Sequence, residues 1–250
     1  MVFLRIGVEM TKETRFGRWY RNSIGKIIPE YAVSTLILCW VLNSTIYTGT
    51  QILCADSKHY DLTTNLDRSI PFVKEWVWVY VICFGFWVIN YVLVAREGKE
   101  HWNRFVIAEM LSKIICGLCF ILIPTTNVRP EVTGSDLSSM VMRFVYSMDR
   151  PTNLFPSIHC LVSWMCFIGI YNSRKIPKWY KVFSCLFAIA VCASTQFTKQ
   201  HYIVDVFAGI TIGQMCYVLV GKTRIYSMIV GIFEKINELV LGEIDSYDNQ

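Results

Sequence analysis

Six apolar stretches, separated by polar segments, make up most of the chain. They cover about residues 31–53, 72–95, 105–124, 154–171, 179–197 and 202–220. A helix of ~20 apolar residues crosses the ~30 Å hydrocarbon core of a bilayer. The pattern therefore predicts an all-α, polytopic membrane protein with six transmembrane helices.

The polar segments at the two ends set the domain boundaries. We expect a basic N-terminal arm over residues 1–29, a six-helix catalytic domain over 30–221 and an amphipathic tail over 222–250. Interleaved aromatic and basic residues in the arm indicate either a helix lying on the membrane surface or a partly disordered segment. The longest internal polar segment, residues 125–152, is too polar to span.

Composition and charge support this topology. Hydrophobic residues make up 54% of the chain and charged residues only 17%, which is typical of membrane proteins. Six spans put both termini on one side, where 16 Lys and Arg residues lie, against 7 on the other side. The positive-inside rule then predicts a cell-membrane protein with cytoplasmic termini and an outward-facing segment 125–152. We attribute the net charge of +5 to the topology of the membrane protein, and we expect no nucleic-acid partner.

Two of the four histidines lie where an apolar run meets a polar segment. His201 and Asp205 are four residues apart, so on a helix the carboxylate can reach the imidazole and fix its tautomer. A histidine oriented by a carboxylate is nucleophilic or basic. The second, His159, follows Pro156-Ser157-Ile158 at the expected start of a helix. Both histidines are predicted on the same outward face.

Two arginines and a serine in this region suit a phosphate group. Arg143 and Arg150 are seven residues apart and would share a face if the segment is helical. Guanidinium groups bind oxyanions through paired donors. Ser157 begins the fourth span, where its hydroxyl and the free N–H groups of the helix can bind the same anion. For each residue alone, a loop charge or a helix cap is the favoured explanation.

Taken in order, these residues form a composite pattern: Arg143-x6-Arg150-Pro151, then Pro156-Ser157-x-His159, then Ser194-x6-His201-x3-Asp205. This pattern resembles the type-2 phosphatidate phosphatase superfamily, whose motifs read K-x6-RP, P-S-x-H and S-R-x5-H-x3-D. The resemblance covers roughly residues 105–220. It implies a lipid phosphate phosphatase-like helical bundle and phosphoester chemistry through a phosphohistidine, with no metal or other cofactor.

The resemblance also implies roles for individual residues. His201 matches the nucleophile, Asp205 its orienting carboxylate and His159 the acid that protonates the leaving alkoxide. Arg150 and Ser157 match phosphate ligands, and Arg143 stands where the family has lysine.

One position departs from the family. Thr195 replaces the arginine of the third motif, and we hypothesise that Lys199 supplies the missing charge. Similar departures occur in the branch resembling inositol phosphorylceramide and sphingomyelin synthases, which transfer a head group to a lipid alcohol. Two charged residues, Glu109 and Lys113, lie inside the third span at the favourable i, i+4 spacing. We read them as a structural ion pair or as a substrate contact.

The sequence thus predicts a hydrolase for a membrane lipid phosphate monoester or pyrophosphate, phosphatidate-like or polyprenyl. The first alternative is a lipid phosphotransferase with a ceramide- or diacylglycerol-type acceptor. The second is a non-catalytic lipid transporter or scramblase on the same helices.

Overall fold

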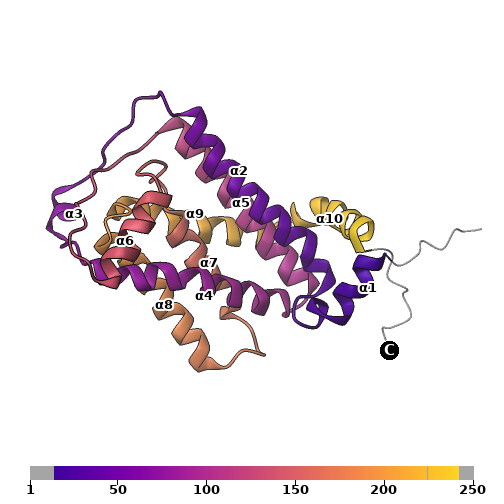
Figure 1. The fold of residues 1–250 in the computed structure, drawn as a ribbon. Coiled ribbons are helices and arrows are strands. Elements are labelled where there is room, and N and C mark those ends of the chain that lie inside the picture. Colours follow the sequence, from indigo (N-terminus) through magenta and orange to yellow (C-terminus); the bar gives the residue numbers. More distant parts are fainter. Residues whose placement is uncertain (1–13, 224, 242–250) are drawn as a thin grey trace, which may run out of the picture.

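The computed structural model describes residues 14–223 and 225–241, and within them every regular element is helical. The main helices follow in chain order (Figure 1): α1 (Arg15–Asn22), α2 (Val33–Leu53), α3 (Asn65–Ser69), α4 (Val77–Ala95), α5 (Lys99–Leu122), α6 (Leu137–Met148), α7 (Ile158–Tyr171), α8 (Lys178–Phe197), α9 (Ile203–Lys222) and α10 (Ile225–Leu241). The predicted all-α class is confirmed.

Five of these helices, α2, α4, α5, α8 and α9, are long and apolar enough to cross a membrane. Short 3-10 turns at Glu30–Ala32 and Lys74–Trp76 lead into α2 and α4 and lengthen those two spans. Among the described residues, five of the six predicted spans are therefore helices with the length and composition of a membrane span.

The fourth apolar run, residues 154–171, is the exception. Its helix, α7, has only 14 residues, which is roughly 21 Å at 1.5 Å per residue and falls short of the ~30 Å core. The run loses its first turn because Pro156 has no N–H to donate and Ser157 caps the helix instead of continuing it. Hydropathy counts residues 154–157 as part of the span, although they precede the helix and are not helical.

The short helix α7 lies in the middle of the bundle and packs against α4, α5, α8 and α9. Two glycines permit close approach there. A Cβ on Gly209 of α9 would lie 2.4 Å from the carbonyl oxygen of Ser157, and one on Gly169 of α7 would lie 2.8 Å from the Phe105 ring. The start of α9 is thereby held against the start of α7, which is where the two histidine motifs lie.

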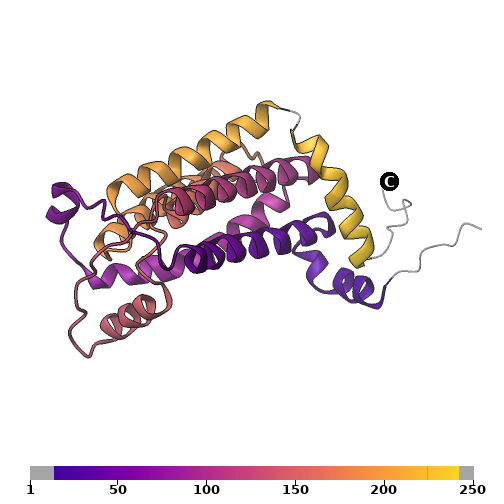
Figure 2. The same ribbon diagram turned by 90° about the horizontal axis from the view of Figure 1, so that it is seen from above.

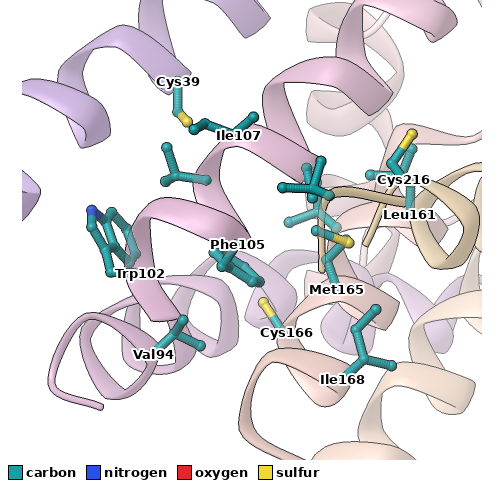
Figure 3. Close-up of a cluster of buried hydrophobic side chains, with 14 of the residues drawn as sticks. Cys39, Val94, Trp102, Phe105, Ile107, Leu161, Met165, Cys166, Ile168 and Cys216 are labelled. Carbon is teal, nitrogen blue, oxygen red and sulfur yellow. The ribbon is translucent and has the colours of Figure 1, made fainter. Parts of the chain in front are cut away.

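The main apolar core lies where α5 and α7 meet their neighbours (Figure 3). Trp102, Phe105, Leu161 and Met165 are fully buried in it. Inside a bilayer such contacts stabilise the bundle mainly by close packing, because lipid tails are as apolar as the side chains. The core therefore fixes α7 relative to α5 and α9.

The two ends of the bundle differ. At one end α10 crosses α2 and α5 and contacts α1 (Figures 1 and 2). Asn237 of α10 accepts from the Ser34 N–H at 3.1 Å and donates to the Tyr31 carbonyl at 3.2 Å. We call the opposite end, with α3, α6 and the start of α9, the histidine end. The predicted acidic end of the tail and the first 13 residues of the arm lie outside the described residues.

Candidate active site

His201 lies in the turn between α8 and α9, two residues before α9 begins. Its Nδ1 is 2.9 Å from the Leu154 carbonyl oxygen and 3.2 Å from Oδ2 of Asp205. Both neighbours accept hydrogen bonds, so Nδ1 carries a proton and Nε2 keeps its lone pair. The predicted His201–Asp205 pair is present, although it forms across the helix start and not along a continuous helix.

Asp205 is fixed by the same helix start. Its Oδ2 accepts from the Tyr202 N–H at 2.9 Å, which is the capping arrangement of the third helical residue. The side chain is fully buried and its Oδ1 has no hydrogen-bond partner among the described residues. Asp205 is therefore held in place by the backbone and aimed at the imidazole.

Burial and charge act in opposite directions on His201. Burial lowers the pKa of His201, but the hydrogen bond and the charge of Asp205 outweigh burial and leave the pKa raised above its ordinary value. The Asp205 carboxylate thus stabilises the imidazolium form. A histidine of this kind is a stronger base and nucleophile than a free imidazole.

His159 faces His201 from the first turn of α7. The two ring centroids are 6.1 Å apart. Tyr80 stacks on the His159 ring at 4.4 Å, Trp87 lies 5.4 Å away, and Nδ1 is 3.5 Å from the Tyr80 hydroxyl. Its Nε2 is buried and has no partner among the described residues. The aromatic rings fix the imidazole and leave one nitrogen available to a substrate.

Asp149 connects the helices around the site to a neighbouring loop. The sequence reasoning missed this residue. The Tyr47 hydroxyl donates to Oδ1, and the Tyr80 hydroxyl donates to Oδ2 at 3.2 Å. The guanidinium of Arg129 lies 3.9 Å from Oδ2. Asp149 therefore links α2 and α4 to the loop that carries Arg129.

Arg129 is the second residue that the sequence reasoning missed. Its side chain is only 8% exposed, and it donates to the Asp149 carbonyl and to the Gln200 side chain, next to His201. The guanidinium stacks over the Tyr146 ring at 4.7 Å, and its buried Nε has no hydrogen-bond partner within the described part of the chain. A signal existed, because Arg129-Pro130 is a second Arg-Pro pair in the same polar segment.

The two predicted arginines lie elsewhere. Arg143 is exposed on α6 and donates to the carbonyls of Val132 and Gly134 at 3.1 and 2.8 Å. Arg150 is exposed two residues beyond the end of α6, so the two do not share a helix face. Neither lines the cavities that reach His201. Their role as phosphate ligands stays a prediction.

Ser157 is the N-cap of α7, as expected. Its Oγ accepts from the Cys160 N–H at 3.3 Å, and its own N–H donates to the Asp205 carbonyl at 3.0 Å. The two histidine motifs are thus joined by a backbone hydrogen bond. Binding of phosphate by Ser157 is untested by this geometry.

Lys199 points away from the histidines in this structure. Its Nζ donates to the carbonyls of Asp67 and Ile70 at 2.8 and 2.5 Å. Thr195 is buried, and its carbonyl accepts from the His201 N–H at 3.2 Å. The position where the resemblance expects an arginine therefore supports the backbone of His201 and carries no charge.

Two cavities meet at His201. The first, of about 460 Å³, is lined mainly by apolar side chains of α4 and α6, together with Asn43, Tyr47 and His159. The second, of about 490 Å³, has a mixed lining that includes Ile70, Pro71 and Phe72. It carries more charged and amide side chains than the first: Asp61, Asp67, Arg68, Arg129, Gln196 and Lys199. We call them the apolar cavity and the polar cavity. One imidazole is thus reached from an apolar side and from a polar side.

Among the described residues, no three His, Cys, Asp or Glu side chains are grouped as metal ligands.

Comparison with known proteins gives one match. The profile of a family described as PAP2 superfamily matches residues 64–219, from just before α3 to near the end of α9. No curated protein and no solved structure gives a significant match. The matched segment contains both histidines, Asp205 and Arg129.

Proposed function

The chain belongs to the PAP2 superfamily, the type-2 phosphatidate phosphatases, and on this basis we propose that it cleaves a lipid phosphate ester through a phosphohistidine. One observation carries the proposal. His201, held through Nδ1 by Asp205, faces His159 at 6.1 Å, and the apolar cavity leads to both rings. Members of this superfamily are phosphatases or related phosphotransferases.

The first step forms the covalent intermediate. Nε2 of His201 attacks phosphorus, and the bond between phosphorus and the lipid oxygen breaks. His159, which the negative charge of the bound phosphate favours in its protonated form, gives its proton to the leaving alkoxide, which becomes the lipid alcohol. The positive charge that develops on His201 is stabilised by Asp205, as in other carboxylate–imidazole pairs.

The second step regenerates the enzyme. His159 is now neutral and accepts a proton from water while the water oxygen attacks phosphorus. The bond between phosphorus and Nε2 of His201 breaks, and inorganic phosphate leaves. This step restores the proton to His159 and the lone pair to His201.

Phosphoryl transfer also requires donors around the equatorial oxygens. We propose Arg129 as the main cation, because its guanidinium lies beside His201 in the polar cavity and is oriented by Asp149 and Gln200. Ser157 and the first N–H groups of α7 supply further donors. Arg143, Arg150 and Lys199 remain candidates if the loops rearrange when substrate binds.

We propose that the bundle spans the cell membrane with both termini cytoplasmic and the histidine end outward. Five helices meet the length for spanning, and α7 completes the bundle from within. The bias of Lys and Arg toward the side of the termini supports this orientation. Phe144 and Met148 on α6 are 64% and 72% exposed and line the apolar cavity, which supports entry of the lipid from the bilayer.

A phosphotransferase is the second candidate. Thr195 takes the place of a phosphate-binding arginine, and the polar cavity offers hydrogen-bonding groups to a polar head group beside His201. In this reaction a lipid hydroxyl replaces water in the second step. The first step is unchanged.

The decisive test is phosphate release by the purified protein from phosphatidate and from polyprenyl phosphate in EDTA. His201→Ala should abolish release, whereas His59→Ala, at a loop residue that lines neither cavity, serves as the matched control. The wild-type protein should also trap a labelled phosphohistidine. Release that continues unchanged in His201→Ala would refute the mechanism. No phosphate release, no transfer to a lipid alcohol and no trapped phosphohistidine would together favour a transporter.

A second measurement separates the two reactions. A lipid donor labelled in its phosphate is supplied with and without a lipid alcohol. Hydrolysis gives labelled inorganic phosphate in both samples, whereas transfer gives a labelled lipid only when the alcohol is present. Parallel assays of three alanine variants rank the cations by the activity that each variant loses: Arg129→Ala, Arg143→Ala and Arg150→Ala. We expect the largest loss of activity for Arg129→Ala.

A further inference from the structure

A buried polar cluster lies beside the apolar cavity, away from the two histidines. Lys113 of α5 donates from Nζ to Oδ1 of Asn43 at 2.8 Å and lies 3.6 Å from the Glu109 carboxylate. The Lys113 and Glu109 side chains are 3% and 5% exposed. Intramembrane charges of this kind are costly and mark functional sites. The reaction proposed above uses none of these three residues.

The ion pair fixes the orientation of the Asn43 amide. A lysine ammonium can only donate, so the amide atom it contacts must be the oxygen. The NH₂ group of Asn43 then remains as a donor, and it has no acceptor among the described residues. Packing of Ile46 against Gly117, whose added Cβ would lie 2.9 Å away, holds α2 and α5 in this register.

Asn43 lines the apolar cavity, one turn from Tyr47 on the same face of α2. Tyr47 donates to Asp149 at the histidine end, so Asn43 lies roughly 6 Å further along the cavity. The other unpartnered polar atoms of the wall, Oγ1 of Thr152 and Nε2 of His159, belong to the histidine end. A free donor therefore lies a short distance beyond the site of phosphate chemistry, in an otherwise apolar wall.

We propose that Asn43 is a specificity residue that donates a hydrogen bond to an acyl carbonyl of the lipid substrate. This inference rests on the proposed function and names its substrate class. An ester of a glycerolipid or the amide of a ceramide carries such a carbonyl a few covalent bonds from the phosphate. A polyprenyl chain has none and leaves the half-buried NH₂ group of Asn43 unpaired, which disfavours binding.

The test compares two phosphatidates of equal chain length, one with ester-linked chains and one with ether-linked chains that lack the carbonyls. We expect the wild-type protein to prefer the ester in kcat/KM by about three- to tenfold, the range for one hydrogen bond. Asn43→Leu should bring the ratio to about one by raising KM for the ester alone. Asn43→Asp, which keeps the contact with Lys113 but loses the donor, should do the same.

Turnover of the ether lipid reports the folding of each variant. Asn90→Leu is the matched control, because Asn90 is also a buried helix asparagine but bonds Phe86 and Tyr180 outside the cavity, so its ratio should match the wild type. A wild-type ratio of one, a preference that survives in Asn43→Leu, or an equal loss on both lipids would overturn the proposal. A wild-type protein inactive on both lipids would overturn the proposed function as well. The phosphohistidine trap tests that function separately from the lipid preference.

Discussion

Replacing Asp205 by asparagine tests the core of the mechanism. The substitution keeps the size of the side chain but removes the charge that stabilises the His201 imidazolium. A hydrogen bond to a charged group is worth ~1.5–3 kcal/mol, and each 1.36 kcal/mol corresponds to a factor of ten. We therefore expect kcat/KM to fall by roughly ten- to a hundredfold.

The loss should stay below the ~10⁴-fold seen when the carboxylate of a serine-protease triad becomes an amide. In that case the imidazole adopts the wrong tautomer. Here the Leu154 carbonyl also accepts from Nδ1 of His201, at 2.9 Å, so part of the tautomer preference survives. The structure thus predicts an intermediate effect.

The pH profile provides a second readout. In the wild-type protein the pKa of His201 is raised, because the hydrogen bond and charge of Asp205 outweigh burial. Since the nucleophile must be unprotonated, kcat/KM falls as the pH drops through that raised pKa. In Asp205→Asn burial dominates, the pKa decreases, and the acidic limb should move to lower pH.

The assay is phosphate release from phosphatidate in mixed micelles across the pH range. Asp56→Asn, on an exposed loop residue, is the control for a change of one carboxylate. A loss below about threefold, or an acidic limb that does not move, would show that Asp205 does not act through His201.

Three further outcomes are expected. Arg129→Ala should lower kcat/KM by about a hundredfold, and Arg129→Lys should restore only part of it, because a lysine cannot make the paired contacts of a guanidinium; equal activities of the two variants in the phosphate-release assay would contradict this. Gly209→Ala should lower the thermal midpoint in detergent by the equivalent of about 1–3 kcal/mol, since its Cβ would meet the Ser157 carbonyl at 2.4 Å, whereas Gly85→Ala, in open space, should not. Lys113→Met should destabilise the protein by about 3–5 kcal/mol, because it leaves Glu109 charged and unpaired. Adding Glu109→Gln should recover the thermal midpoint, and a double variant that stays as unstable would argue against the ion pair.

The sequence predicted the parts of the site that depend on local geometry. The His201–Asp205 pair and the Ser157 cap are set within a few residues of a helix start, so spacing alone places them. The start of the fourth span at Ser157 agrees with α7, but the apolar run 154–171 is longer than the helix, because hydropathy cannot distinguish an apolar non-helical segment from an apolar helix turn.

The position of Arg129 could not be predicted from the spacing of residues along the sequence. Arg129 comes to His201 through an irregular loop, where no periodicity relates it to the rest of the chain. The sequence reasoning assigned Arg150-Pro151 because its spacing matched a known motif, and it did not consider Arg129-Pro130. Only tertiary contacts with Gln200 and Tyr146 separate the two pairs.

The meeting of the apolar and polar cavities at His201 bears on the fate of the products. In the hydrolysis we propose, the alcohol retains its hydrocarbon chain and returns to the bilayer, whereas the phosphate leaves through the hydrated side. Recombination would require both to return to the same imidazole from two different solvents. The arrangement of the two cavities therefore slows recombination at the site by separating the products, while the overall equilibrium stays that of the free lipids and phosphate.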